Sequence, residues 1–418
     1  MSISTIDNEN EIVTADGTPL RISIKRVERR QKIRAFGLIF PLFLFVLLFF
    51  VFPIVKLGLV SIDNSIVPDV LAHSVVAIEA WDGNGLPPES VYAAMAKDLV
   101  LAKQNRTIGR VAKRLNFEKS GYRQLLVSST RKSKRLNAPF KDALIQANKK
   151  WAEPAYWQIL ARESSPITFS YFFAALDLGI NADGSIYMQP EEQSIYIEIF
   201  ARTLVISAQV TIACLLLGFP IAYLMANLPA RTSNLLIILV LLPFWISLLV
   251  RTTAWIVLLQ DQGLINQTLQ LIGVIDEPLS LIRNRIGVVV AMTHILLPFM
   301  TLPLFSVMKG INPSLMRAAS SMGANPAQAF FQVYLPLTVA GIGAGGLLVF
   351  ILSVGYYITP ALVGGPQDIM ASQLIDVQMN KQLNWNMASA IGVILLGITM
   401  VLFAIYNRLV GIDRMKLG

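Results

Sequence analysis

A stretch of apolar residues without a single charge, at positions 35–55, constrains the fold of this chain more than any other feature. About 20 apolar residues in one helix are enough to cross the hydrocarbon core of a bilayer. Five further apolar runs follow residue 199, in a chain that is 54% hydrophobic and only 15% charged. These runs are predicted to cross the membrane at 203–228, 235–250, 286–308, 337–358 and 388–405. The expected fold class is therefore an all-α membrane protein with six transmembrane helices.

The distribution of basic residues predicts how the helices are oriented. Seven Lys and Arg residues lie at 21–34, in a predicted disordered tail at 1–34 that precedes the first transmembrane helix at 35–60. Basic residues next to membrane spans concentrate on the cytoplasmic side. No small-residue cleavage site follows the first apolar run, so we expect that helix to stay uncleaved. Both tails, 1–34 and 411–418, are then predicted to be cytoplasmic.

Several classes of function are excluded by residues that the sequence lacks. Cys214 is the single cysteine, so no disulfide can form within the chain, and the two histidines, His73 and His294, cannot build a metal cluster. No glycine-rich loop ending in Lys-Ser or Lys-Thr is present, so the chain is not expected to hydrolyse ATP by that route. The net charge of +9 is not arranged as a basic stripe interleaved with aromatic residues, which argues against nucleic acid as a partner.

A short polar interruption at 312–336 separates two of the apolar runs. Asn312 followed by Pro313 predicts a helix start, and Gly323 predicts a left-handed stop. Asn325 and Pro326 then predict a second start. Each half is shorter than a membrane span, so the sequence predicts two short helices on the membrane surface. Their apolar positions repeat at helical spacing: Leu315, Ala318, Ala319 and Met322, then Ala327, Phe330, Phe331 and Tyr334.

This interruption resembles the cytoplasmic loop signature of the permease subunits of binding-protein-dependent ABC importers. The family pattern is Glu-Ala-Ala, three residues, Gly, nine residues, then Ile-x-Leu-Pro. The present sequence departs from it twice, with Arg317 at the Glu position and Val333 at the Ile position. The resemblance implies a type I ABC importer permease fold with a coupling loop at 309–337 that contacts an ATPase. The residues assigned to ATPase coupling by this resemblance are Arg317, Ala318, Ala319, Gly323, Val333, Leu335 and Pro336.

Further segments are similar to the spermidine/putrescine branch of these permeases, over roughly 199–410. They are Leu-Pro-Phe-Trp at 242–245, Gly-Leu-Ile-Asn at 263–266 and Ile-Thr-Pro-Ala-Leu-Val-Gly-Gly-Pro at 358–366. The resemblance implies a bacterial inner-membrane permease for a small organic solute, polyamine-like or opine-like. It also implies four kinds of partner: a dimer of ATPase subunits that binds ATP and magnesium, a second permease subunit, an extracytoplasmic solute-binding protein and membrane lipid. No cofactor is expected on this chain.

A polar insert at 61–198 separates the first span from the five-helix core at 199–410. Helical patterns at 89–100, 140–151 and 153–162 predict a small, mostly helical extracytoplasmic domain. The many Lys and Arg residues at 103–150 are interpreted first as a solvated surface. The alternative is a docking face for a solute-binding protein or for anionic lipid headgroups.

The spans contain few residues that suit solute recognition. No carboxylate lies at 203–249 or at 287–360, which leaves no acidic chain for a proton relay. Trp255, Tyr356, Tyr357 and Asn384 are candidates for the solute pathway, although an interfacial aromatic belt is the preferred interpretation of these positions. A polyamine needs carboxylates or an aromatic cage, and Asp261 and Asp368 are the nearby carboxylates.

Two other classes of function remain open from the sequence. An ion-coupled secondary transporter should carry intramembrane acids and internal inverted repeats. A membrane anchor should depend on the insert at 61–198 and not on the segment around Gly323.

Overall fold

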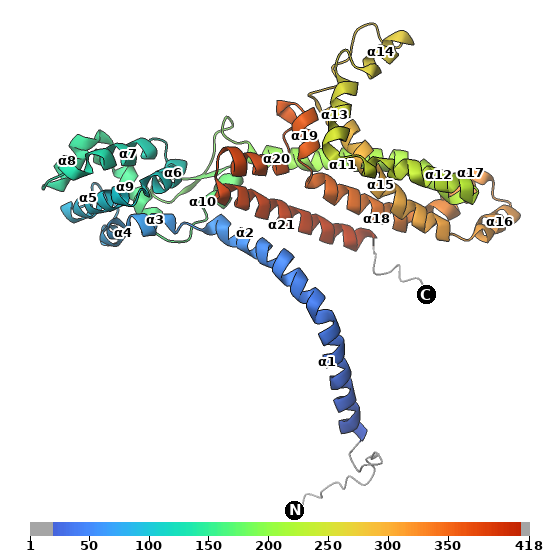
Figure 1. Ribbon diagram of the computed structural model, residues 1–418, viewed down its shortest axis with the longest axis horizontal. Coiled ribbons are helices and arrows are strands. Elements are labelled where there is room, and N and C mark those ends of the chain that lie inside the picture. The colour runs from blue at the N-terminus through green and yellow to red at the C-terminus, as the bar shows by residue number, and fades with distance from the viewer. Residues whose placement is uncertain (1–19, 411–418) are drawn as a thin grey trace, which may run out of the picture. The chain divides into compact units, whose positions relative to one another are not determined.

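The computed structural model describes residues 20–410, which form two compact units that divide after Leu59. In the first unit, α1 (Leu20–Val46), a π-helical turn η1 (Leu47–Val51) and α2 (Phe52–Ile62) follow one another without a break (Figure 1). The prediction of a disordered tail up to residue 34 is therefore wrong for 20–34. The Arg, Lys, Ile and Gln residues there favour helix, and no Gly or Pro interrupts them. The predicted tails at 1–19 and 411–418 lie outside the described residues.

The insert begins the second unit and is built mainly from short helices. The helices predicted at 89–100 and 153–162 are present. The one predicted at 140–151 ends at Ala147, where an extended Asn148 separates it from a short 3-10 turn. The two-stranded antiparallel hairpin and the helices at 108–118 and 122–132 were not predicted. The elements are α3 (Ile66–Val70), α4 (Ala72–Ile78), α5 (Glu89–Gln104), α6 (Ile108–Glu118), α7 (Tyr122–Lys132), η2 (Ser133–Arg135), α8 (Phe140–Ala147), η3 (Lys149–Ala152), α9 (Pro154–Arg162), α10 (Ser170–Ala175), β1 (Leu178–Ile180) and β2 (Ile186–Met188).

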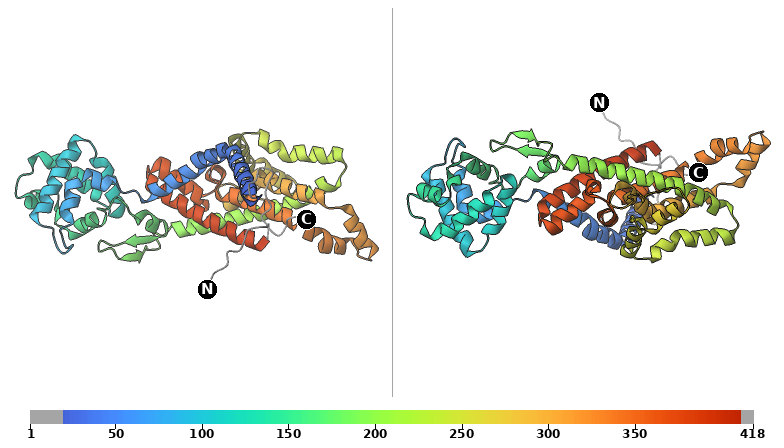
Figure 2. Two further views of the ribbon diagram at one scale, coloured as in Figure 1. Left: turned by 90° about the horizontal axis from the view of Figure 1, so that it is seen from below. Right: turned by 90° about the horizontal axis from the view of Figure 1, so that it is seen from above.

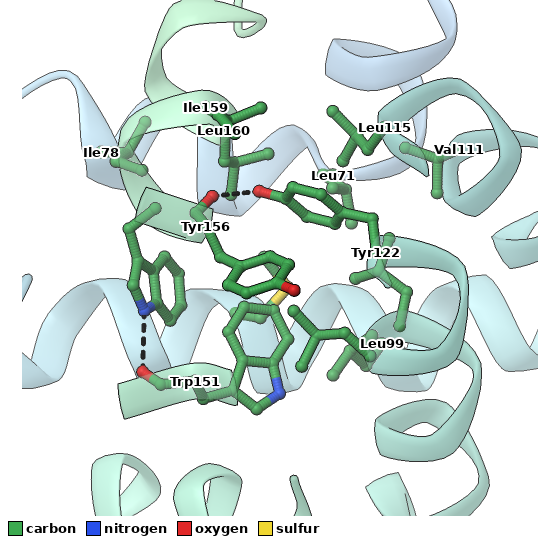
Figure 3. Close-up of a cluster of buried hydrophobic side chains, with 14 of the residues drawn as sticks. Leu71, Ile78, Leu99, Val111, Leu115, Tyr122, Trp151, Tyr156, Ile159 and Leu160 are labelled. Carbon is green, nitrogen blue, oxygen red and sulfur yellow. Dashed lines mark hydrogen bonds between the residues drawn. The ribbon is translucent and has the colours of Figure 1, made fainter. Parts of the chain in front are cut away.

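Aromatic side chains fill the core of the insert (Figure 3). The rings of Trp151 and Trp157 lie 4.7 Å apart, and Trp157 Nε1 donates to the Trp151 carbonyl at 3.1 Å. Tyr122 Oη donates to the carbonyl of Tyr156. The polar ends of these large side chains are thus satisfied inside an apolar cluster, as buried Tyr and Trp require.

The remaining elements include the long apolar helices that follow the insert. They are α11 (Tyr196–Asn227), α12 (Ala230–Leu241), η4 (Leu242–Trp245), α13 (Leu248–Leu259), α14 (Leu264–Leu271), α15 (Arg285–Gly310), α16 (Pro313–Ser321), α17 (Pro326–Ala329), η5 (Phe330–Tyr334), α18 (Leu335–Val354), α19 (Ile358–Val363), η6 (Pro366–Asp368), α20 (Ala371–Asp376), η7 (Val377–Lys381) and α21 (Trp385–Val410). Within the described residues, five helical stretches are long and apolar enough to cross a membrane, and the number is six if one bent pair of helices is counted as a single span.

Helices α11, α15 and α18 pack against one another at the centre of this group (Figure 1 and Figure 2). Gly341 and Gly345 of α18 face α15, where a Cβ atom on Gly345 would lie 3.0 Å from the Met300 carbonyl oxygen. Small residues four positions apart let two helices approach closely in lipid, and the partner here is α15 of the same chain.

The predicted span at 235–250 is wrong as a single helix. The chain breaks between α12 and α13, and the two halves meet at an angle of 98°. Pro243 lies in the short 3-10 turn between them, which agrees with the tendency of proline to end a helix.

Candidate functional site: the 309–337 segment and the outer loops

The first half of the 309–337 segment folds as the sequence predicts. Asn312 caps α16 by accepting a hydrogen bond from the Ser314 N–H at 2.9 Å, and Pro313 occupies the first turn. The helix ends before Gly323, which adopts φ of +91°. Glycine reaches this left-handed conformation without the steric penalty that other residues meet.

Most of the apolar stripe of α16 has no partner in the described part of the chain. Ala319 is buried, but Leu315 is 44% exposed and Met322 is 83% exposed. A lone apolar side chain on a surface is ordinary, whereas a helix that exposes most of its apolar stripe is typical of a docking site. The stripe is therefore available for a partner.

The second half of the segment differs from the prediction. Helix α17, the π-helical turn η5 and α18 form one continuous stretch, Pro326–Val354, so 326–334 is the start of a membrane span and not a separate surface helix. In η5 the Leu335 N–H donates to the Phe330 carbonyl, five residues earlier. We attribute the continuity to this widened turn, which accommodates the ring of Pro336 without ending the helix.

An aromatic cluster joins this stretch to α11. The ring of Phe330 stacks on Tyr334 with centroids 5.7 Å apart, and it lies edge-on to Tyr223 and Phe219 of α11 at 5.9 and 6.2 Å. Lys309 Nζ also donates to the Ala226 carbonyl at 3.2 Å. These contacts fasten both the start of the Pro326–Val354 stretch and the end of α15 to the end of α11, and α16 lies in the chain between them.

The residues predicted for ATPase coupling occupy both halves of this segment. Arg317, Ala318 and Gly323 are exposed in and after α16, where Arg317 carries the charge opposite to that of the family residue. Val333 and Leu335 are half-buried in the continuous stretch, and Pro336 is exposed. The exposed members therefore lie on or just after a helix that Asn312 caps at its start and that precedes the stretch packed on α11.

The four candidates for the solute pathway lie on different elements. Trp255 of α13 donates from Nε1 to His294 Nδ1 of α15 at 3.1 Å, which packs the two helices together. Tyr356 and Tyr357 lie between α18 and α19, where Tyr357 is 41% exposed. Asn384 caps α21 by accepting from the Met387 N–H at 3.2 Å, and it lines a polar cleft beside α6.

Arg251 has a role that the sequence did not reveal. Its guanidinium donates from Nη2 to the carbonyls of Pro243 and Ile246, at 2.9 Å for Ile246, in the break between α12 and α13. A broken helix leaves carbonyls without partners, and in an apolar environment each unpaired carbonyl costs several kcal/mol, about the cost of a lost hydrogen bond in hydrocarbon. Arg251 therefore stabilises the bend. The sequence signal for this bend is an Arg that follows a proline-containing helix break by five to eight residues.

The carboxylates near the outer loops are not equivalent. Asp368 is 6% exposed, lies 3.4 Å from Arg285 Nε and also accepts from the Gly365 N–H. Asp261 is exposed. Asp368 is therefore committed to an ion pair within the chain. Within residues 20–410, no group of three His, Cys, Asp or Glu side chains is placed to hold a metal ion.

Comparison with known proteins identifies the family. Residues 215–412 match the model of the binding-protein-dependent transport system inner membrane component family. The chain is 35% identical to the spermidine/putrescine transport system permease protein PotB of Haemophilus influenzae, over 51% of this chain and 75% of that protein. It is 33% identical to PotB of Escherichia coli, over 51% of this chain and 78% of that protein.

A solved structure also resembles the chain. It is a bacterial alginate ABC transporter in complex with its pentasaccharide-bound periplasmic protein, with a TM-score of 0.43 and 19% identity over 54% of this chain and 81% of the other. The sequence relationship to the two permeases covers three quarters of their length. The chain therefore belongs to the family of binding-protein-dependent transport system inner membrane components, and it is a multi-pass permease subunit of an ABC importer.

Proposed function

We propose that this permease imports a polyamine-like solute together with a second permease subunit, a dimer of ATPase subunits and an extracytoplasmic solute-binding protein. Helix α16 is the element that docks on the ATPase. Both termini are cytoplasmic under this proposal, and the insert at 61–198 is extracytoplasmic. ATP and magnesium are bound by the partner ATPase, and this chain contributes no nucleotide site.

The observation that carries the proposal is the combination of an exposed apolar stripe on α16 with the packing of the stretch that follows it against α11. Leu315 and Met322 are exposed, while Phe330 and Tyr334 hold the following stretch against α11. A short rigid helix of this kind transmits a rigid-body movement when a partner pulls on it. The long helices α11, α15 and α18 receive that movement directly.

The solute class is proposed from the relatives, which are named as spermidine/putrescine permeases. In the helices α11 to α21 that are long enough to span a membrane, Glu198 is the single carboxylate, and it pairs with Arg202. A cationic solute therefore needs acidic groups from the solute-binding protein or from the second permease subunit.

Labelling of an introduced cysteine tests the orientation. In a Cys214→Ser background, Ser320→Cys should resist a membrane-impermeant maleimide in intact spheroplasts and react after permeabilisation. The matched control, Asn84→Cys in the insert, should react in both conditions, because Asn84 is exposed. Reaction of Ser320→Cys from outside would place α16 on the wrong side and refute the proposal.

Uptake of radiolabelled putrescine and spermidine tests the solute and the energy source. Cells that express the complete transporter should accumulate one of them, and ATP depletion should abolish accumulation. Uptake that survives ATP depletion but stops when the proton gradient collapses would identify a secondary transporter instead. Accumulation of neither solute would refute the polyamine assignment. The ATPase partnership is tested separately, by whether the ATPase co-purifies with the permease.

A further inference from the structure

Helix α6 of the insert presents a row of cations on one exposed face. Arg110, Lys113 and Phe117 are spaced by three and four residues, which places them along one side of the helix, and Arg106 lies two residues before its start with φ of +56°; all four side chains are exposed. The opposite side of α6 carries Val111 and Leu115 into the core of the insert. We call the four exposed residues the α6 ridge.

The α6 ridge belongs to a strongly polarised distribution of charge. Ten Lys and Arg side chains are exposed between residues 97 and 150, against one exposed acid, Asp142. Residues 60–96 show the reverse, with five exposed acids and no Lys or Arg. Two of these acids lie against the basic segment: Asp63 lines a cleft with Arg110 and Lys113, and Glu89 accepts from the Lys141 N–H at 3.0 Å. The cations therefore predominate along 97–150 without being separated from every acid.

A polar cleft of about 320 Å³ borders the α6 ridge. Its walls are Arg110, Lys113 and Phe117 from α6, together with Tyr171, Asn384 and Asn386. The rings of Phe117 and Tyr171 lie 4.9 Å apart. Lys113 Nζ reaches across to the carbonyl of Leu383 at 3.0 Å and also donates to that of Gln382. The α6 ridge thus adjoins the beginning of α21, a helix long enough to span the membrane.

Buried ion pairs hold α6 firmly in place. The guanidinium of Arg114, which is 6% exposed, bonds to Asn64 at 2.7 Å and to Glu118 at 2.6 Å. It also pairs with Glu163, and Arg162 pairs with Glu118. Burial raises the pKa of Glu118, although the neighbouring Arg114 charge acts against this rise. Removal of one member of such a network leaves a buried charge without a partner, so the network resists displacement of α6.

The segment that enters the insert is attached to the same helix, α21. The Asn386 side-chain amide donates to the carbonyls of Val60 and Asp63, both at 2.8 Å. A force applied to the α6 ridge therefore reaches the start of α21 through Lys113 and through the chain around Asp63.

Two of the cations on the α6 ridge are free to bind a partner. Within the described residues, neither Arg106 nor Arg110 donates a side-chain hydrogen bond, whereas Lys113 is engaged with backbone carbonyls. Arginine and aromatic side chains are enriched where proteins bind one another, and opposite charges on two surfaces guide their association. Resting on the proposed function above, we propose that the α6 ridge is the docking site for an acidic surface of the solute-binding protein.

The test compares two double variants that remove the same charge. The full transporter is purified in phosphatidylcholine nanodiscs, and binding of the solute-binding protein encoded with this permease is measured by biolayer interferometry at 50 and 300 mM NaCl. Arg106→Gln/Arg110→Gln should raise Kd about tenfold at low salt and flatten its salt dependence, because the effect is electrostatic. Lys134→Gln/Arg135→Gln, the matched control on η2, should change Kd less than about twofold. Lys113 and Arg114 are left intact, because they position the insert.

Each outcome of this comparison is decisive. An unchanged Kd in the α6 variant, or equal losses in both variants, would overturn the proposal. Charge effects seen only in phosphatidylglycerol nanodiscs would assign the α6 ridge to anionic headgroups and would also overturn it. Co-purification of the ATPase is scored on the same samples, so its absence reports failure of the proposed function and not of the docking site. Thermal unfolding followed by tryptophan fluorescence verifies that the insert is folded in each variant.

Discussion

The ring of Tyr223 on α11 lies edge-on to the ring of Tyr334, with centroids 5.3 Å apart and planes at 83°. The same Tyr223 ring is also edge-on to Phe330 at 5.9 Å. One side chain therefore connects α11 to the stretch that continues from the 309–337 segment into α18. Movement of α16 is expected to reach α11 through these contacts.

Tyr223→Ala should uncouple ATP hydrolysis from transport. Each aromatic pair contributes about 0.5–1.5 kcal/mol beyond its buried area, so the loss of two pairs should lower uptake roughly tenfold. The ATPase should still co-purify, because the exposed stripe of α16 is unchanged. Solute uptake and ATP hydrolysis by the purified complex measure the effect. Tyr223→Phe keeps both ring contacts and serves as control, and loss of uptake in this variant as well would contradict the explanation.

Gly323→Ala should distort the end of α16. Glycine adopts φ of +91° there, and a left-handed residue with a Cβ costs about 1–2 kcal/mol. No atom lies within 4 Å of the added Cβ, so the cost is one of backbone conformation alone. Recovery of the ATPase with the purified permease should fall, and Gly323→Asn, which tolerates this conformation better, should recover more. Equal recovery in all three proteins would contradict the prediction.

Gly345→Ala should destabilise the packing of α15 on α18. The new Cβ would lie 3.0 Å from the Met300 carbonyl oxygen and 2.9 Å from the Met300 sulfur, and overpacking of this kind costs about 1–3 kcal/mol. The thermal unfolding temperature in detergent should fall. Gly397→Ala in α21 is the control, because no atom lies within 4 Å of its added Cβ, and its unfolding temperature should remain equal or rise slightly.

The insert should lose stability between pH 10 and pH 12. Burial raises the pKa of Tyr171 to about 12, whereas the same side chain ionises near pH 10 in the unfolded chain. The stabilising contribution is complete below pH 10 and is lost as the pH rises through 12, on the order of 2 kcal/mol. Unfolding followed by the fluorescence of the buried tryptophans measures this loss. Tyr171→Phe should show a shallower dependence over the same range, and an identical slope in both proteins would rule out Tyr171 as a cause.

The sequence predicted those features that depend on local chemistry. The Asn312 cap and the left-handed Gly323 were both confirmed, because a cap and a positive φ act over a few residues. The Arg317 assignment stays a prediction, since it depends on a partner surface.

The errors arose where the backbone departs from a regular α-helix or where charged residues mask the apolar pattern. The sequence pattern at 326–334 predicts a separate surface helix. In the structure, a π-helical turn ahead of Pro336 keeps this stretch continuous with α18. The apolar run at 235–250 predicts one straight helix. In the structure the chain bends there by 98°, and Arg251 donates hydrogen bonds to the carbonyls at the bend. In α6, the many Lys and Arg residues obscured the apolar positions that face the core of the insert.

The continuity of Pro326–Val354 fixes the rotational phase of the whole stretch. Each residue in an α-helix advances the direction of its side chain by about 100°, so a single residue inserted near Leu335 would turn Gly341 and Gly345 away from α15. The same insertion would leave the contacts of Phe330 with α11 unchanged. The number of residues between Phe330 and Gly341 is therefore fixed, because an insertion or deletion there would keep one of the two helix contacts and lose the other.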